Sequence, residues 1–273
     1  ILGLVDEAYD YKDTSKILIE DENILEMKKD ELKNIRKKVQ IIFQDPFSSL
    51  NPRMSVGKII EEALLVNNIG KKIDRPDMVK DIMQKVGINP DYFNRYPHEF
   101  SGGQRQRIGI ARALIIKPKL IVADEPVSAL DVSIQVQILK LMQKLRDELN
   151  LTYLFVAHDL SVVDYFCDRI AVMYLGKIME IGETKKIVSE SSHPYTKALL
   201  SAVPIPDPKY KKKQIILGGD IPSPINPPKG CVFHTRCPSR FEPCDKEIPP
   251  EIELSPGHKC SCWLHVKNKA KSA

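Results

Sequence analysis

The sequence contains no G-x-x-x-x-G-K-[ST] run, the loop in which backbone N–H groups and a lysine hold the phosphates of a nucleotide. Gly3 is the only glycine that precedes Gly57. No apolar run reaches the length needed to span a bilayer. We therefore expect any association with a membrane to go through a partner.

Paired cysteines and basic stripes are missing as well. The six cysteines contain no C-x₂-C pair of the kind found in zinc ribbons, and in 273 residues they do not suggest a disulfide scaffold. The 41 Lys and Arg residues against 36 Asp and Glu residues give a net charge of only +5, with no block typical of nucleic-acid binding. With 42% apolar and 28% charged residues, the composition indicates a globular protein with a full core and a small second unit.

Two motifs carry most of the functional information. The first, Ser101-Gly102-Gly103-Gln104, predicts a tight glycine turn and a helix from Gln104 to Leu114. A helix start binds anions through unpaired N–H groups and its positive dipole end. The second is an apolar strand that ends in Asp124 and Glu125. One acid can hold Mg²⁺ and the other can handle a water, so a phosphate site with an acid pair predicts nucleotide hydrolysis.

Three further residues lie in an order that fits these motifs. Gln44 follows the apolar segment 39–43, Asp131 closes the run Ser128-Ala129-Leu130-Asp131, and His158 follows the apolar segment 153–157. Taken singly, each has an ordinary structural explanation, because glutamines occur in turns and histidines after strands make structural hydrogen bonds. The ordered set favours a functional explanation.

In this order the motifs resemble those of ABC-transporter ATPases. The segments 43–52 and 193–199 and the cysteine-bearing tail narrow the resemblance to the ATP-binding subunits of oligopeptide and dipeptide importers. The resemblance covers nearly the whole chain. Its parts are, in chain order, the Q-loop glutamine (Gln44), the signature (101–104), the Walker B strand (120–126), the D-loop (128–131) and the switch histidine (His158).

The resemblance implies a role for each matched residue. Asp124 would hold Mg²⁺, Glu125 would polarise the attacking water and His158 would sense the γ-phosphate. Gln44 would touch both the metal and the water. The remaining residues would complete the ATP site of the opposite subunit, so that two ATP molecules lie between two chains; they are Ser101, Gly102, Gly103, Gln104 and Asp131.

The resemblance also implies partners and a location. The chain would pair with a second ATPase subunit, identical or paralogous, and dock on two membrane permeases at the cytoplasmic face of the cell membrane. An external solute-binding protein would act indirectly, and no nucleic acid is expected. ATP and Mg²⁺ are the expected cofactors.

The missing phosphate loop leaves two explanations open. One is a chain cut just after the Walker A lysine, since Ile1 to Val5 resembles the end of the helix that follows that loop. Such a chain would be inactive alone. The other is a degenerate subunit that hydrolyses nothing and supplies only its signature motif to a partner. A soluble ABC ATPase outside transport is a further alternative, although the coiled-coil insertions or tandem second ATPase usual in such proteins are absent.

The expected fold is an α/β P-loop NTPase core of the ABC type, incomplete at its N-terminus. Strands that alternate with helices predict a parallel sheet with ligands at the strands' carboxyl ends. We expect the ATPase domain over 1–188, with a helical subdomain over about 51–118. The residues 189–273 would form a C-terminal extension, with a helix pair up to 202 and a proline-rich, loop-rich remainder.

The tail cysteines have two open interpretations. Four thiolates in a segment with little core suit an iron–sulfur cluster, and some peptide-importer ATPases that this tail resembles carry a [4Fe–4S] cluster. The alternative is a set of reduced structural thiols. The candidate ligands are Cys231, Cys237, Cys244 and Cys262, with Cys260 as an extra thiol.

Overall fold

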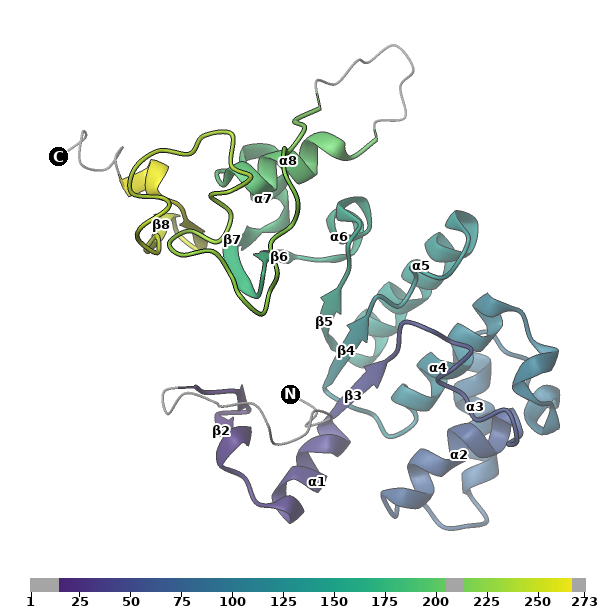
Figure 1. Ribbon diagram of the computed structural model, residues 1–273. Coiled ribbons are helices and arrows are strands. Elements are labelled where there is room, and N and C mark those ends of the chain that lie inside the picture. Colours follow the sequence, from purple (N-terminus) through teal and green to yellow (C-terminus); the bar gives the residue numbers. More distant parts are fainter. Residues whose placement is uncertain (1–14, 205–213, 267–273) are drawn as a thin grey trace. The chain divides into compact units, whose positions relative to one another are not determined.

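The computed structural model describes residues 15–204 and 214–266, and the chain divides into two compact units, one up to His158 and one from Asp159 (Figure 1). The predicted helix end at Ile1 to Val5 lies outside the described residues. The division after His158 differs from the domain boundary expected at 188, which stays a prediction.

A three-stranded parallel sheet is the centre of the first unit (Figure 1). Its strands are β3 (Val39–Ile42), β4 (Leu120–Asp124) and β5 (Thr152–Val156), with β4 in the middle. Val39 pairs with Leu120, and Leu120 pairs with Thr152. The three carboxyl ends therefore meet at one edge, as the sequence predicts.

The two faces of this sheet pack against different helices. Ile42, Ile121 and Ala123 are buried on the face next to α4 (Gly102–Leu114) and α5 (Val132–Leu149). Val39 packs with Ile24 and Ile35 in a second cluster on the other face. That cluster is formed by the hairpin β1 (Leu18–Ile19) and β2 (Glu22–Asn23), the turn η1 (Ile24–Glu26) and the helix α1 (Lys29–Lys38).

Residues 51–118 contain helices joined by turns, and the helical subdomain expected there stays a prediction. The helices are α2 (Val56–Val66), α3 (Arg75–Lys85), the short turns η2 (Pro90–Asn94) and η3 (Pro97–Glu99), and α4. Ser55 occupies the N-cap position of α2, but its side chain makes no capping hydrogen bond. Gly87 ends α3 with a positive φ of 76°, which glycine adopts without steric cost.

The start of α4 differs from the prediction. The helix begins at Gly102, two residues earlier than Gln104, and neither glycine forms a left-handed turn. Ser101 is the N-cap: its hydroxyl accepts from the Gln104 N–H at 3.4 Å, while Gln104 Oε1 accepts from the Ser101 N–H at 3.0 Å. This reciprocal capping box starts the helix early. A Cβ on Gly103 would lie 2.6 Å from Ile134 Cγ2, so close packing against α5 explains that glycine.

The second unit begins with a helix that the sequence reading missed, α6 (Leu160–Phe166), and then forms an antiparallel hairpin. Strands β6 (Arg169–Tyr174) and β7 (Lys177–Glu183) are joined by Leu175 and Gly176, which both have a positive φ. Two such residues make the two-residue turn typical of hairpins. The expectation of a parallel sheet is therefore wrong beyond β5, because this turn is too short for a parallel crossover.

The closing helix pair is present as α7 (Thr184–Glu190) and α8 (Pro194–Ala202). The tail is less irregular than predicted, because β8 (Glu251–Ser255) and β9 (His258–Ser261) extend the hairpin to a sheet of order β6-β7-β9-β8. Phe233 is fully buried among Tyr174, Cys231 and Cys244. The tail thus shares both a core, which includes Tyr174 of β6, and a sheet with residues before 188.

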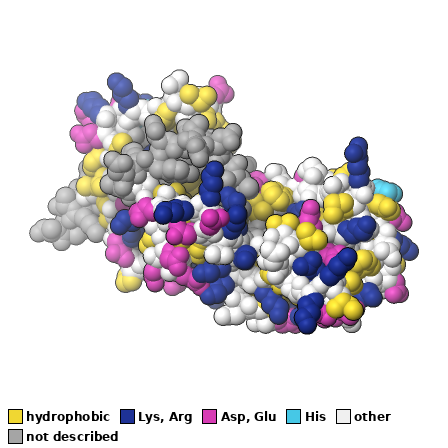
Figure 2. Space-filling model, turned by 90° about the horizontal axis from the view of Figure 1, so that it is seen from below, with side chains coloured by type: hydrophobic (Ala, Val, Ile, Leu, Met, Phe, Trp, Pro, Cys, Tyr) yellow, Lys and Arg dark blue, Asp and Glu magenta, His cyan; other side chains and the backbone are white. Residues whose placement is uncertain are grey.

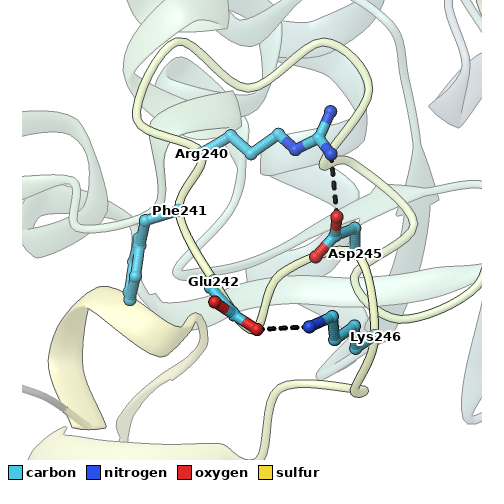
Figure 3. Close-up of a pocket in the computed structure, with 5 residues that line it drawn as sticks. All are labelled: Arg240, Phe241, Glu242, Asp245 and Lys246. Carbon is cyan, nitrogen blue, oxygen red and sulfur yellow. Dashed lines mark hydrogen bonds and ion pairs between the residues drawn. The ribbon is translucent and has the colours of Figure 1, made fainter.

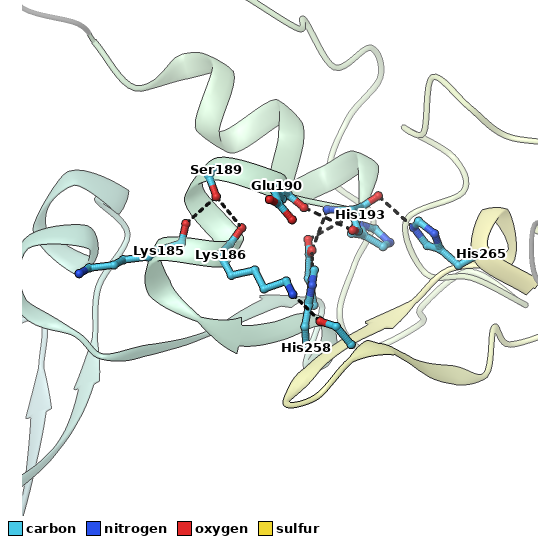
Figure 4. A network of polar contacts seen from close by, with 10 residues as sticks. Lys185, Lys186, Ser189, Glu190, His193, His258 and His265 are labelled. Carbon is cyan, nitrogen blue, oxygen red and sulfur yellow. Dashed lines mark hydrogen bonds and ion pairs between the residues drawn. The ribbon is translucent and has the colours of Figure 1, made fainter.

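A buried carboxylate ties this sheet to the start of α8. Glu180 is fully buried on β7, and its oxygens accept from the N–H groups of Ser192 at 2.7 Å and His193 at 3.0 Å. The ring of His258, on β9, lies 2.8 Å from the same carboxylate. Figure 4 shows His193, His258 and His265 around this network. One side chain therefore fastens the C-terminal hairpin to the rest of the unit.

The molecular surface carries charges of both signs. Lys and Arg side chains stand among Asp and Glu side chains on the face shown in Figure 2, which has no broad area of one sign. None of the described helices combines the length and apolar character that a membrane span requires.

We predict that acid weakens the second unit through His193. Burial lowers the pKa of His193 from 6.5 to about 4, and its Nδ1 accepts from the Tyr195 N–H at 3.1 Å. Between these pH values the unfolded chain binds a proton that the folded chain excludes, so stability falls by roughly 3 kcal/mol as the pH drops from 6.5 to 4. Denaturation in urea at a series of pH values measures this. His193→Asn keeps a capping acceptor without titrating, and an equally steep acid dependence in that variant would contradict the prediction.

We predict that Gly103→Ala destabilises the first unit. Its new methyl would clash with Cγ2 of Ile134, which is fixed to a branched carbon and cannot move away by itself. Overpacking of this kind costs about 1 to 3 kcal/mol. Gly109→Ala in the same helix is the matched control, because no atom lies within 4 Å of the added carbon. Chemical denaturation should show a loss for the first variant only, and equal effects would exclude the packing explanation.

Candidate functional site

Three of the predicted catalytic residues meet at the carboxyl edge of the parallel sheet. Gln44 follows β3, Glu125 follows β4 and His158 follows β5. Gln44 Nε2 donates to Glu125 Oε2 at 3.1 Å, and His158 Nδ1 lies 3.0 Å from the same oxygen. The carboxylate in the middle is about one quarter exposed, whereas the His158 side chain is about 71% exposed. A ligand at this edge can therefore reach all three side chains.

Asp124 lies beside this group on the last position of β4 and is exposed. Among the residues that the structure describes, no three His, Cys, Asp or Glu side chains gather as a metal site. Mg²⁺ is often held by one or two carboxylates together with water and substrate phosphates. A single exposed aspartate fits that mode. The Gln44 amide nitrogen is used in the Glu125 contact, so only its Oε1 could face a metal.

The signature residues lie at the N-terminus of α4. The N–H groups of Gly102 and Gly103 belong to the first turn, where a helix provides no acceptor for them. A Cβ on Gly102 would lie 3.4 Å from Leu130 and 3.8 Å from the Phe47 ring. The exposed Asp131 is the N-cap of α5, although its side chain makes no capping bond. Nothing in the described unit brings these residues into hydrogen-bond contact with Glu125.

The three arginines of α4 are structural anchors. Arg105 lies over the Phe47 ring at 4.1 Å. Arg107 donates to the Val86 carbonyl at 2.7 Å, and Arg112 donates to the Ser49 carbonyl at 2.5 Å. Burial lowers the pKa of Arg107 and Arg112. Two of the three thus fasten the segment after Gln44 to the signature helix, a link across more than 50 positions that no local pattern could reveal.

The family of this chain follows from its similarity to known proteins. The ABC transporter family model matches residues 3–128, and the model for the C-terminal region of oligopeptide/dipeptide transporters matches residues 179–244. The oligopeptide transport ATP-binding protein AppF of Bacillus subtilis is 51% identical over 259 residues, which cover 93% of this chain and 79% of AppF. The chain belongs to the ATP-binding subunits of oligopeptide/dipeptide ABC transporters.

Two solved structures agree with this membership. The chain superposes on cbiO1 from Clostridium perfringens, part of the ABC transporter complex cbiONQ, with a TM-score of 0.60 and 26% identity over 69% of this chain and 72% of that one. The ATP-binding cassette MJ0796, solved as a dimer bound to ADP and Pi after hydrolysis, gives a TM-score of 0.54 and 29% identity over 61% and 72% of the two chains. The predicted ABC ATPase fold is confirmed.

An iron–sulfur cluster in the tail of this ABC subunit receives no support from the structure. Cys231, Cys244 and Cys262 are buried and Cys237 is half-buried, yet the described residues contain no arrangement of three or more side chains able to hold a metal ion. Burial, with a smaller contribution from the nearby thiols, raises the pKa of Cys262 to about 11. Neutral buried thiols that pack with Phe233 agree with the alternative of structural cysteines.

A cavity of about 310 Å³ lies within the cysteine-bearing tail (Figure 3). It is lined by Arg240, Phe241, Glu242, Asp245 and Lys246. Arg240 pairs with Asp245 at 2.9 Å and lowers the pKa of that carboxyl, and Lys246 pairs with Glu242. Its charges are already matched, and none of the predicted ATP-site residues lines it.

Proposed function

We propose that this ABC subunit hydrolyses ATP to energise an importer of oligopeptides, dipeptides or related solutes. The observation that carries the proposal is the Glu125 carboxylate, which is contacted by Gln44 and His158 from the two neighbouring strands. A carboxylate held between an amide and an imidazole is placed to accept a proton from a water and to orient it. Phosphoryl transfer requires mainly such positioning and charge neutralisation.

The other residues at the sheet edge take complementary roles in this proposal. Asp124 would hold Mg²⁺ through a water or directly, and the ion would neutralise charge on the β- and γ-phosphates. His158 would contact the γ-phosphate, because its side chain lies next to Glu125 and is about 71% exposed. Gln44 would report the state of the site to the segment that follows it, since Arg112 ties Ser49 to the signature helix.

The signature helix serves a second copy in this proposal. Ser101, Gly102, Gly103 and Gln104, with Asp131, would cap an ATP whose hydrolysis is run by Glu125 of the opposite chain. The helix start supplies N–H groups and the positive end of its dipole for this purpose. MJ0796, a relative in fold, is a dimer. Two permease subunits would bind this dimer at the cytoplasmic face of the membrane, with a solute-binding protein acting from outside.

We predict that Glu125→Gln stops turnover and spares binding. In a transporter assembled with a complete version of the chain that includes the phosphate loop, ATP hydrolysis should fall by about 10² to 10⁴-fold, the range expected for loss of a general base. Binding of a fluorescent ATP analogue should persist, because the amide keeps the shape of the site. The control is Gln137→Glu, at an exposed position on α5 away from the sheet edge. Unchanged turnover in Glu125→Gln would remove Glu125 from the proposed role.

A second candidate function rests on the signature helix, which begins with a complete capping box. The chain would then hydrolyse nothing itself and would supply its signature to a partner's ATP.

A mixed dimer separates the two candidates. The partner ATPase carries Gln in place of its own water-polarising glutamate, and ATP turnover is measured in the assembled transporter. If turnover of up to half the wild-type rate remains, this chain hydrolyses ATP. If no turnover remains, this chain has the signature role. In the second case Ser101→Ala should lower the turnover of a wild-type partner, because it removes the cap of α4.

A further inference from the structure

Glu125 has an unusual backbone conformation. Its φ of 42° lies in the left-handed region, which non-glycine residues seldom adopt. The next residue is Pro126, and a residue before proline prefers an extended conformation. Such a conformation persists only where the surroundings hold it, and it is often found where a side chain must point in a particular direction.

Two neighbours hold the Glu125 peptide groups. Its N–H donates to the Val156 carbonyl on β5 at 3.0 Å, which extends the ladder between β4 and β5 by one residue. Its carbonyl accepts twice from Ser128: from the backbone N–H at 3.2 Å and from the hydroxyl at 3.0 Å. Ser128 is half-buried in the turn between β4 and α5. Any residue there can provide the N–H, but the second bond needs a hydroxyl.

The backbone conformation decides where the carboxylate points. A change of φ at Glu125 rotates the bond from Cα to Cβ and moves the side chain away from its present neighbours. The carboxylate would then lose Gln44 Nε2 at 3.1 Å and His158 Nδ1 at 3.0 Å. The two contacts come from different strands, so one direction of the Glu125 side chain satisfies both.

We propose that Ser128 is a positioning residue for Glu125. The Ser128 hydroxyl stabilises the left-handed backbone conformation of Glu125, and that conformation places the Glu125 carboxylate between Gln44 and His158. The functional consequence rests on the proposed role of Glu125 in ATP hydrolysis. Ser128 itself touches neither the water nor the phosphates. Its loss lowers the rate of the chemical step and leaves ATP affinity in place.

The first experiment needs no nucleotide. In ¹H–¹⁵N NMR spectra of the ¹⁵N-labelled chain, Ser128→Val should shift the Glu125 backbone amide, the Gln44 side-chain amide and the His158 ring. Threonine has the same shape as valine but keeps the hydroxyl, so Ser128→Thr should leave these three signals near their wild-type positions. Ser133→Ala, an exposed serine at the start of α5, is the control for a lost hydroxyl elsewhere. Equal spectra for the Thr and Val variants at these three groups overturn the proposal.

The second experiment measures ATP turnover in the assembled transporter. Ser128→Val should lower kcat between about 10- and 100-fold, as expected for a slightly misplaced catalytic group, with KM for ATP unchanged, and Ser128→Thr should recover most of the loss. Glu125→Gln is measured in parallel. If Glu125→Gln abolishes turnover while Ser128→Val retains the full rate, the positioning role of Ser128 is excluded and the proposed function is kept. If Glu125→Gln itself retains turnover, the proposed function fails, and the NMR comparison still decides whether Ser128 orients the side chain.

Discussion

The contact of one carboxylate oxygen of Glu125 with both Gln44 and His158 is the interaction on which the rest of the site depends. It needs three parallel strands that end level with one another, and the register from Ile42 through Ala123 to Phe155 provides this. The crossovers α4 and α5 keep the strands parallel, and the same helices carry the signature and the D-loop residue Asp131. The fold thus positions the proposed catalytic group and the proposed partner-facing residues with one set of elements.

Close packing connects these two groups. Gly103 permits α4 to approach Ile134 of α5, and Arg112 holds the Ser49 carbonyl next to the same helix. The segment that begins at Gln44 is therefore attached at one end to Glu125 and further along to α4. Packing therefore connects the start of α4 with the arrangement at Glu125 within the first unit.

The sequence predicted the elements that have strong local signals. The parallel arrangement of β3, β4 and β5 followed from the alternation of strands with helices, and it places Gln44, Glu125 and His158 at one edge of the sheet. Sequence reading failed where the decisive contact was distant. The burial of Arg112 against residue 49 and the pairing of β9 with β7 have no local signature. The early start of α4 was predictable, because Ser101 and Gln104 have the spacing of a capping box.

The second unit shows why composition misled the reading of the tail. The eight prolines of residues 204–238 disfavour helices and central strands in that range, but they say nothing of the strands that follow. There the alternation of Glu251, Ile252, Glu253 and Leu254 is a strand signal that the cysteine count overshadowed. The fully buried Glu180 explains why this distant hairpin stays attached, since a buried carboxylate without His258 and the two backbone N–H groups would be costly. Cys231, Cys237 and Cys244 contribute to an apolar core around Phe233, in which Tyr174 and Met179 also pack.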